Sequence, residues 1–205
     1  MTISRNISVM AQGASTAGIL SGGYGGLGAS VSPTTAGNTV FTTDGSTWSS
    51  TQKIVRGTSV ATTSGTSIDF TGIPSWVKRI TIMINAVSTS GTSLVIFQLG
   101  STTFTTSGYV GYCNSWTGTI PTTITTGLGT TANNAAVDGR QGTMTITNLT
   151  GNTWIGQGNF MLTTSTNGGV SVGNVTLGGV LDRVRLTTIN GTDTFDAGSI
   201  NIMYE

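Results

Sequence analysis

The sequence predicts an all-β protein: an antiparallel β-sandwich of jelly-roll type, preceded by an extended N-terminal arm rich in Gly, Ser and Thr. Three observations support this. Residues that favour helices are scarce, since lysine occurs only at 53 and 78 and glutamate only at 205. Apolar residues recur with period two from about residue 53 onward. Turn residues separate these runs, as in two packed antiparallel sheets.

The first 52 residues form one predicted region, the N-terminal attachment arm. Between Gln12 and Asn38 the chain is mostly Gly, Ala, Ser and Thr. A segment with so few apolar side chains cannot bury a core of its own, so we expect it to become ordered against a partner. The residues expected to make that attachment are the scattered apolar ones: Ile3, Ile7, Val9, Ile19 and Leu20.

Three glycines of the arm, Gly23, Gly25 and Gly28, fall on the G-x-G-x-x-G spacing of dinucleotide-binding loops. Such a loop needs a helix directly after it, whereas the following residues favour helices poorly and include Pro33. We therefore interpret these glycines as part of the arm. The arm is predicted to end in a small hairpin over residues 38 to 48, turning at Asp44-Gly45.

Residues 53 to 205 form the second predicted region, the sandwich. Its strands are indicated by apolar residues that share one face: Ile80, Ile82 and Ile84, then Met144 and Ile146, then Val184 and Leu186, and finally Ile200, Ile202 and Tyr204. Turns are predicted at Thr89-Ser90-Gly91, Thr150-Gly151-Asn152, Asn167-Gly168-Gly169 and Asn190-Gly191, the last as a type I′ hairpin turn.

Composition argues against several classes of function. The chain has no histidine, which excludes Ser-His-Asp and Cys-His catalysis, and it is not expected to be an enzyme. Its only cysteine is Cys113, so no disulfide or thiolate zinc site forms within it, and no cofactor or metal is expected. A net charge of +1 disfavours nucleic acid. The longest apolar tract, Ile80 to Val87, is far shorter than the roughly 20 residues of a membrane span, so a soluble protein is expected.

Charged groups and the thiol were considered as functional residues. Asp193 and Asp196 could bind calcium or form an acid/base pair, but caps of turns are the favoured interpretation because further oxygen ligands are not evident. Arg183 and Arg185 lie on one face of a strand, and pairing across strands is expected for them. Cys113 is interpreted as a small buried thiol.

Aromatic residues supply the candidate contact site. Tyr109, Tyr112 and Trp116 lie in a stretch rich in Gly, Ser and Thr. Aromatic rings on loops suit sugar faces or protein partners, so the three are candidate glycan or partner contacts; core packing is the alternative for the tryptophan.

Three strings of sequence resemble a β-rich domain of tailed-bacteriophage virion proteins. They are GTSIDFTGIPSWVKRIT from Gly65 to Thr81, LDRVRLTT from Leu181 to Thr188, and GTDTFDAGSINI from Gly191 to Ile202. In that family the domain is the outward-facing C-terminal knob of fibres and decoration proteins. The segment NISVMAQGA, from Asn6 to Ala14, is similar to leading segments of phage head and tail proteins.

The resemblance implies a protein made in the host cytoplasm and located on the outer surface of a phage particle. A short arm with one knob favours a capsid decoration (cement) or head-fibre protein. A tail fibre or a receptor- or glycan-binding adhesin is the alternative, and a carbohydrate-degrading enzyme is the third interpretation. The implied partners are further copies of the chain in a homotrimer, other virion proteins including the major capsid protein, and a host-surface glycan.

Overall fold

The computed structural model describes residues 38–42, 48–52, 54–117, 122–131, 135–164 and 166–205. The chain divides into two compact units, Met1–Ile54 and Val55–Glu205. The predicted attachment residues Ile3, Ile7, Val9, Ile19 and Leu20 lie outside the described residues, as does the glycine-rich segment around them.

The first unit contains two described strands, β1 (Asn38–Thr42) and β2 (Trp48–Gln52). They pair antiparallel, with Thr42 opposite Trp48. The two strands of the predicted hairpin are therefore present, while its Asp44-Gly45 turn lies outside the described residues.

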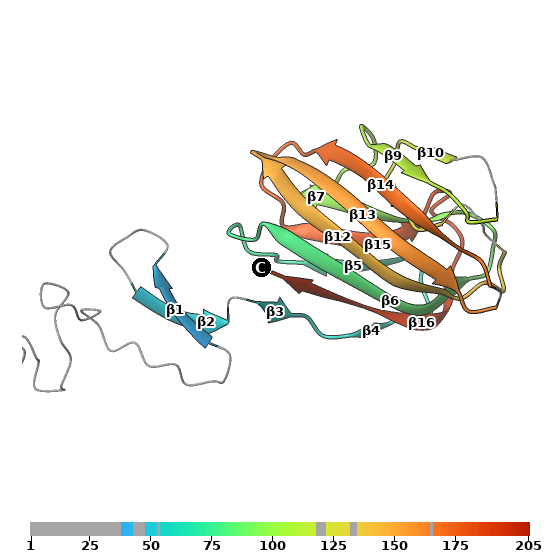
Figure 1. Ribbon diagram of the computed structural model, residues 1–205, viewed down its shortest axis with the longest axis horizontal. Coiled ribbons are helices and arrows are strands. Elements are labelled where there is room, and N and C mark those ends of the chain that lie inside the picture. Colours follow the sequence, from blue (N-terminus) through green and yellow to red (C-terminus); the bar gives the residue numbers. More distant parts are fainter. Residues whose placement is uncertain (1–37, 43–47, 53, 118–121, 132–134, 165) are drawn as a thin grey trace, which may run out of the picture. The chain divides into compact units, whose positions relative to one another are not determined.

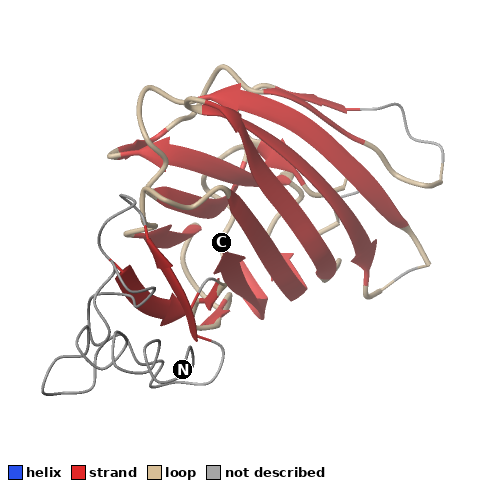
Figure 2. Ribbon diagram, turned by 60° about the vertical axis from the view of Figure 1, so that its left-hand side comes forward, coloured by secondary structure: helices blue, strands red, loops and turns tan. Residues whose placement is uncertain are grey.

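The second unit is a sandwich of two antiparallel sheets, which confirms the predicted fold class (Figures 1 and 2). The large sheet has the order β10-β9-β14-β13-β12-β6-β16-β3, and β4 also pairs with β16. The small sheet has the order β11-β7-β15-β5, and β8 also pairs with β7.

The strands of the large sheet are β3 (Val55–Arg56), β4 (Val60–Ala61), β6 (Arg79–Thr89), β9 (Val110–Cys113), β10 (Thr122–Ile124), β12 (Arg140–Thr150), β13 (Thr153–Leu162), β14 (Gly168–Thr176) and β16 (Phe195–Tyr204). Those of the small sheet are β5 (Ser67–Thr71), β7 (Val95–Ser101), β8 (Thr103–Phe104), β11 (Leu128–Gly129) and β15 (Arg183–Thr188). No helix occurs among the described residues, and none of them therefore forms a helix that could cross a membrane.

The core lies between the two sheets and follows the alternation seen in the sequence. Ile80, Ile82 and Ile84 of β6 point inward and are buried, as are the predicted apolar residues of β12, β15 and β16, with Tyr204 partly buried. Strand β7 of the small sheet is almost entirely buried along its length. The rings of Phe97 and Phe160 join the two sheets, with centroids 6.1 Å apart.

Glycines bring β11 unusually close to the large sheet. A Cβ atom added to Gly156 would lie 2.5 Å from the Leu128 side chain, and one added to Gly173 would lie 2.9 Å from it. Leu128 therefore packs against bare backbone. The inward positions nearest to it are glycines, Gly111 of β9, Gly156 of β13 and Gly173 of β14, and large apolar side chains occupy several outward positions of these strands. We call these the apolar outer face: Val110, Tyr112, Ile155, Val170 and Val172.

Two of the predicted turns differ from the structure. Gly168 and Gly169 are the first residues of β14 rather than a turn, and both are needed because neighbouring atoms come within 3 Å of where a Cβ would lie. At Asn190-Gly191 only the glycine has a positive φ, 68°, so the turn is not type I′. This connection is also not a hairpin, since it leads from β15 in the small sheet to β16 in the large one.

The chain enters the sandwich beside the end of its last strand. Val55 of β3 lies opposite Tyr204 of β16, and Arg56 lies opposite Met203 (Figure 1). We call this the proximal end of the sandwich. Because the strands are antiparallel, the start of β16, the end of β6, the start of β12 and the start of β14 lie at the other, distal end.

Candidate functional site: a pocket on the outer face of the large sheet

A pocket of about 520 Å³ opens on the outer face of the large sheet, toward the distal end. It crosses β13, β12 and β6, and Trp116 forms one wall beside the start of β14. Its volume lies in the range of pockets that hold small ligands, roughly 300–1,000 Å³. The lining includes Trp116, Met83, Met161, Gln141 and Asn159, above a floor at Gly142 and Phe160.

A β-bulge produces the hollow. Arg140 pairs with Val87 but Gly142 pairs with Ile84, so one residue of β12 faces two residues of β6. Ala86, in the bulge, has a φ of 54°. Gly142 has a φ of 148°, and a Cβ there would lie only 2.1 Å from the carbonyl oxygen of Asn159. A side chain at 142 would also meet the buried ring of Phe160, since an added Cβ would lie 3.0 Å from its Cδ1.

Trp116 is held by the start of β14. Its backbone N–H donates a hydrogen bond of 2.8 Å to the carbonyl oxygen of Gly168. Its ring lies against the same glycine, where an added Cβ would be 2.9 Å from Cζ3. The residue is nevertheless 54% exposed. Gly168 thus positions an aromatic ring whose remaining surface is open to a ligand.

The polar part of the pocket is uncharged. Gln141 and Asn159 contribute side-chain amides, and Thr143 contributes a hydroxyl. Neither amide is hydrogen-bonded to another part of the protein in the described structure. No acidic or basic residue lies among the described residues that line the pocket. The site therefore offers free amide donors and acceptors next to apolar surface, without a formal charge.

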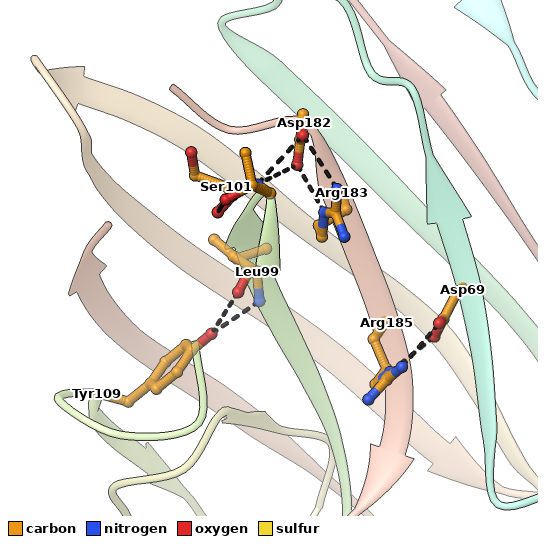
Figure 3. A network of polar contacts seen from close by, with 8 residues as sticks. Asp69, Leu99, Ser101, Tyr109, Asp182, Arg183 and Arg185 are labelled. Carbon is orange, nitrogen blue, oxygen red and sulfur yellow. Dashed lines mark hydrogen bonds and ion pairs between the residues drawn. The ribbon is translucent and has the colours of Figure 1, made fainter. Parts of the chain in front are cut away.

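The three predicted contact aromatics have different environments. Trp116 lines the pocket. Tyr112 is 47% exposed on β9, within the apolar outer face, and does not line the pocket. The interpretation of Tyr109 as a surface ring is wrong, because it is only 2% exposed. Its hydroxyl accepts a hydrogen bond of 2.7 Å from the Leu99 N–H and faces the Leu99 carbonyl oxygen at 3.4 Å (Figure 3). Burial raises the pKa of this phenol.

The two aspartates considered as a catalytic or calcium pair make structural contacts. Asp193 accepts hydrogen bonds from the backbone N–H of Ser93, at 2.9 Å, and from the side-chain amide of Asn190, at 2.7 Å. Asp196 accepts one from the hydroxyl of Ser88. In the described part of the chain no group of three metal-ligating side chains comes together. These contacts agree with the favoured interpretation of structural aspartates.

The predicted arginines lie on the outer face of the small sheet. Arg185 makes two hydrogen bonds of 2.7 Å to Asp69, its cross-strand neighbour, so the expected pairing across strands is confirmed for it (Figure 3). Its guanidinium also lies 4.0 Å from the ring centroid of Phe104. Arg183 instead pairs with the preceding residue, Asp182, at 2.7 Å, and this contact lowers the pKa of the Asp182 carboxyl.

Two reactive or charged side chains, those of Cys113 and Arg140, are buried in the sandwich. Cys113 is buried, as interpreted, and burial raises the pKa of its thiol to about 11. Arg140 is fully buried, and its guanidinium donates a hydrogen bond of 2.9 Å to the carbonyl oxygen of Asp138. Burial lowers the pKa of Arg140, and the nearby carboxylates of Asp138 and Asp196 oppose that shift. Nothing in the sequence around Arg140 predicts its burial.

Sequence reasoning also missed most of the pocket. The alternation of β6 places Met83 opposite the buried isoleucines, whereas no sequence motif singles out Gln141, Asn159 or Met161. For Asn159 and Met161 the alternation of β13 could have indicated exposure, because these two residues point outward while Phe160 and Leu162 point inward. Comparison with known proteins adds no further guide, since no family model, curated protein or solved structure matches the chain.

Proposed function

We propose that this chain is a structural protein of a tailed-bacteriophage particle, attached through its N-terminal arm and displaying the sandwich outward. One observation carries the proposal. The chain enters the sandwich at the proximal end, where Val55 pairs with Tyr204, whereas the pocket and Trp116 lie toward the distal end. A domain held by the segment before Val55 would present its distal end away from the surface that holds it.

The strings that resemble phage virion domains form one connected unit in the fold. Gly65 to Thr81 supplies β5 and the start of β6, and the two later strings supply β15 and most of β16. Although 99 residues lie between the first string and the second, β5 pairs with β15 and β6 pairs with β16. The resemblance therefore covers a pair of adjacent strands in each sheet, which supports treating it as a property of the whole domain.

A structural role also agrees with how the acidic side chains are used. Asp69, Asp138, Asp182, Asp193, Asp196 and Glu205 each accept a hydrogen bond from another group of the protein. They lie at separate places in the sandwich and do not converge on the pocket. Among the structural roles we favour a capsid decoration or head-fibre protein, and a tail fibre is the alternative.

Self-association is part of the proposal. The apolar outer face exposes about half of Val110, Tyr112 and Val172, and its residues carry no charge. Burial of such a face against other copies is favourable, and a closed homotrimer is the assembly that the resemblance implies. Sedimentation of the full chain tests this: we expect a trimer, and Val172→Lys should shift it toward monomer. A monomeric wild-type chain would refute the trimer.

Attachment to particles is the decisive test of the function. Purified phage particles from the source of this sequence should contain the protein by mass spectrometry, and antibodies against the sandwich should label the head. A chain lacking residues 1–52 should keep the sandwich fold, measured by circular dichroism, and should no longer bind particles stripped of the protein. Particles that never contain the protein, or that bind the truncated chain as tightly as the full one, would disprove the proposal.

A further inference from the structure

We propose that the pocket beside Trp116 binds a neutral oligosaccharide. This inference goes beyond the proposed place in a virion and does not depend on it, because the pocket and its chemistry belong to the sandwich alone. It is carried by three features of the described residues: the exposed ring, the unpaired amides and the absence of charge.

The exposed ring selects a ligand with an apolar face. About half of Trp116 is accessible, while one side of its ring lies against Gly168. Met83 and Met161 add polarizable thioether surface on the other sides of the pocket. A flat, partly apolar surface of this kind matches the C–H face of a pyranose ring, which is apolar while its edge carries hydroxyls.

The amides select the edge of the same ligand. Gln141 and Asn159 lie in neighbouring strands, with Gln141 opposite Met161 and Asn159 opposite Thr143. Each side-chain amide can donate and accept hydrogen bonds, and neither is hydrogen-bonded to another group of the described protein. Hydroxyl groups also donate and accept, so a sugar edge can satisfy both amides together with the Thr143 hydroxyl.

The electrostatics of the pocket disfavour charged ligands of similar size. A phosphate or carboxylate would enter the pocket without a cation or a helix N-terminus to replace its hydration, and losing that hydration is costly. None of the described lining residues is charged. A neutral saccharide meets no such cost, and its weakly hydrated C–H face gains from contact with the tryptophan.

The length of the pocket indicates more than one sugar unit. Its lining runs from Trp116, beside β14, across β13 and β12 to Met83 on β6. Three strand spacings of about 4.8 Å each give a length of roughly 14 Å. That length exceeds one pyranose ring and accommodates two or three linked units.

The test uses the full chain on an array of neutral and acidic oligosaccharides, followed by a fluorescence titration with the best neutral one. We expect neutral oligosaccharides to bind and Trp116→Ala to weaken binding at least tenfold. Gln141→Leu and Asn159→Leu, which keep size but remove the hydrogen bonds, should each weaken binding several-fold. Trp76→Ala is the matched control, since Trp76 is also exposed, at 43%, but contacts Tyr204 at the proximal end.

Several results would overturn the proposal. One is a wild-type chain that holds no neutral oligosaccharide on the array, or that prefers acidic ones. Another is equal loss of binding in Trp116→Ala and Trp76→Ala. A third is a change in the sedimentation coefficient of Trp116→Ala with unchanged saccharide binding, which would make this surface a protein contact instead. The array needs no phage particles, so failure here is distinct from failure of the virion proposal.

Discussion

Replacing Tyr109 with phenylalanine should destabilise the sandwich while leaving its shape intact. The phenol hydroxyl accepts a hydrogen bond from the Leu99 N–H at 2.7 Å, in a position where Leu99 is fully buried. The Leu99 carbonyl oxygen keeps a second partner, the Thr105 N–H, at 2.9 Å. The substitution therefore leaves one buried backbone N–H without an acceptor.

The cost of that lost acceptor sets the magnitude. An unsatisfied buried donor costs about 1–3 kcal/mol. For a domain of this size each kcal/mol lowers the melting temperature by about 2–4 °C, so Tyr109→Phe should lower it by roughly 2–12 °C. Urea unfolding of the full chain, followed by tryptophan fluorescence, measures the free energy directly. Tyr112→Phe is the control, because its hydroxyl is on an exposed ring and its loss should change stability by less than about 0.5 kcal/mol.

The same phenol makes stability depend on alkaline pH. Burial raises the pKa of Tyr109 above its ordinary value of 10.0, so the unfolded chain loses this proton first as the pH rises. The contribution of the neutral phenol is thus complete below pH 10 and declines above it. Tyr109→Phe should show a smaller alkaline decline than the wild type. If Tyr109→Phe and Tyr112→Phe match the wild type equally in urea, the hydrogen bond to Leu99 does not stabilise the fold.

Three further outcomes follow from close packing, burial and exposure. Gly173→Ala places a Cβ 2.8 Å from the backbone of β9 and should lower the free energy of unfolding in urea by about 1–3 kcal/mol. Gly178→Ala, which has open space around it, should lower it by less than about 0.5 kcal/mol. Equal losses in the two variants would contradict the tight contact at Gly173. Cys113, whose pKa is raised to about 11, should resist Ellman's reagent at pH 8 until the chain is unfolded, and rapid reaction of the native protein would show that the thiol is accessible. Asp69→Asn should lower stability by at most about 1 kcal/mol, since Asp69 and Arg185 are both about one-third exposed, and a larger loss would show that this pair is not a surface ion pair.

Strands were predictable where one face is apolar and the other polar. In β6 the isoleucines at 80, 82 and 84 alternate with Thr81 and Met83, so period two identifies both the strand and its buried face. Strands β9 and β14 defeat this logic, because their inward positions hold residues such as Gly111 and Gly173 while valines face outward. Only the proximity of β11 explains that inversion, and it brings together residues far apart in the chain.

The candidate site was predictable only in part, for a similar reason. Trp116 could be chosen because it is an aromatic residue in a stretch with a weak strand pattern. The position of its ring depends on Gly168, which contacts the ring from another strand. Gln141 and Asn159 look like ordinary strand residues in the sequence, and the bulge between β12 and β6 beside them is visible only in the pairing of the strands. Tyr109 lies in the same stretch as Trp116, and its burial follows from a hydrogen bond to Leu99 that local sequence does not indicate.

The pairing of Val55 with Tyr204 governs how the sandwich responds to mechanical force. Strands β3 and β4 have two residues each, and both pair with β16 alone. Tension applied through residue 54 would peel them away first, one short ladder after the other, while β5 and β6 stay packed. Residues 55–66 would then extend by up to about 3.5 Å each. The edge of the sheet would then lengthen under load before the core is strained.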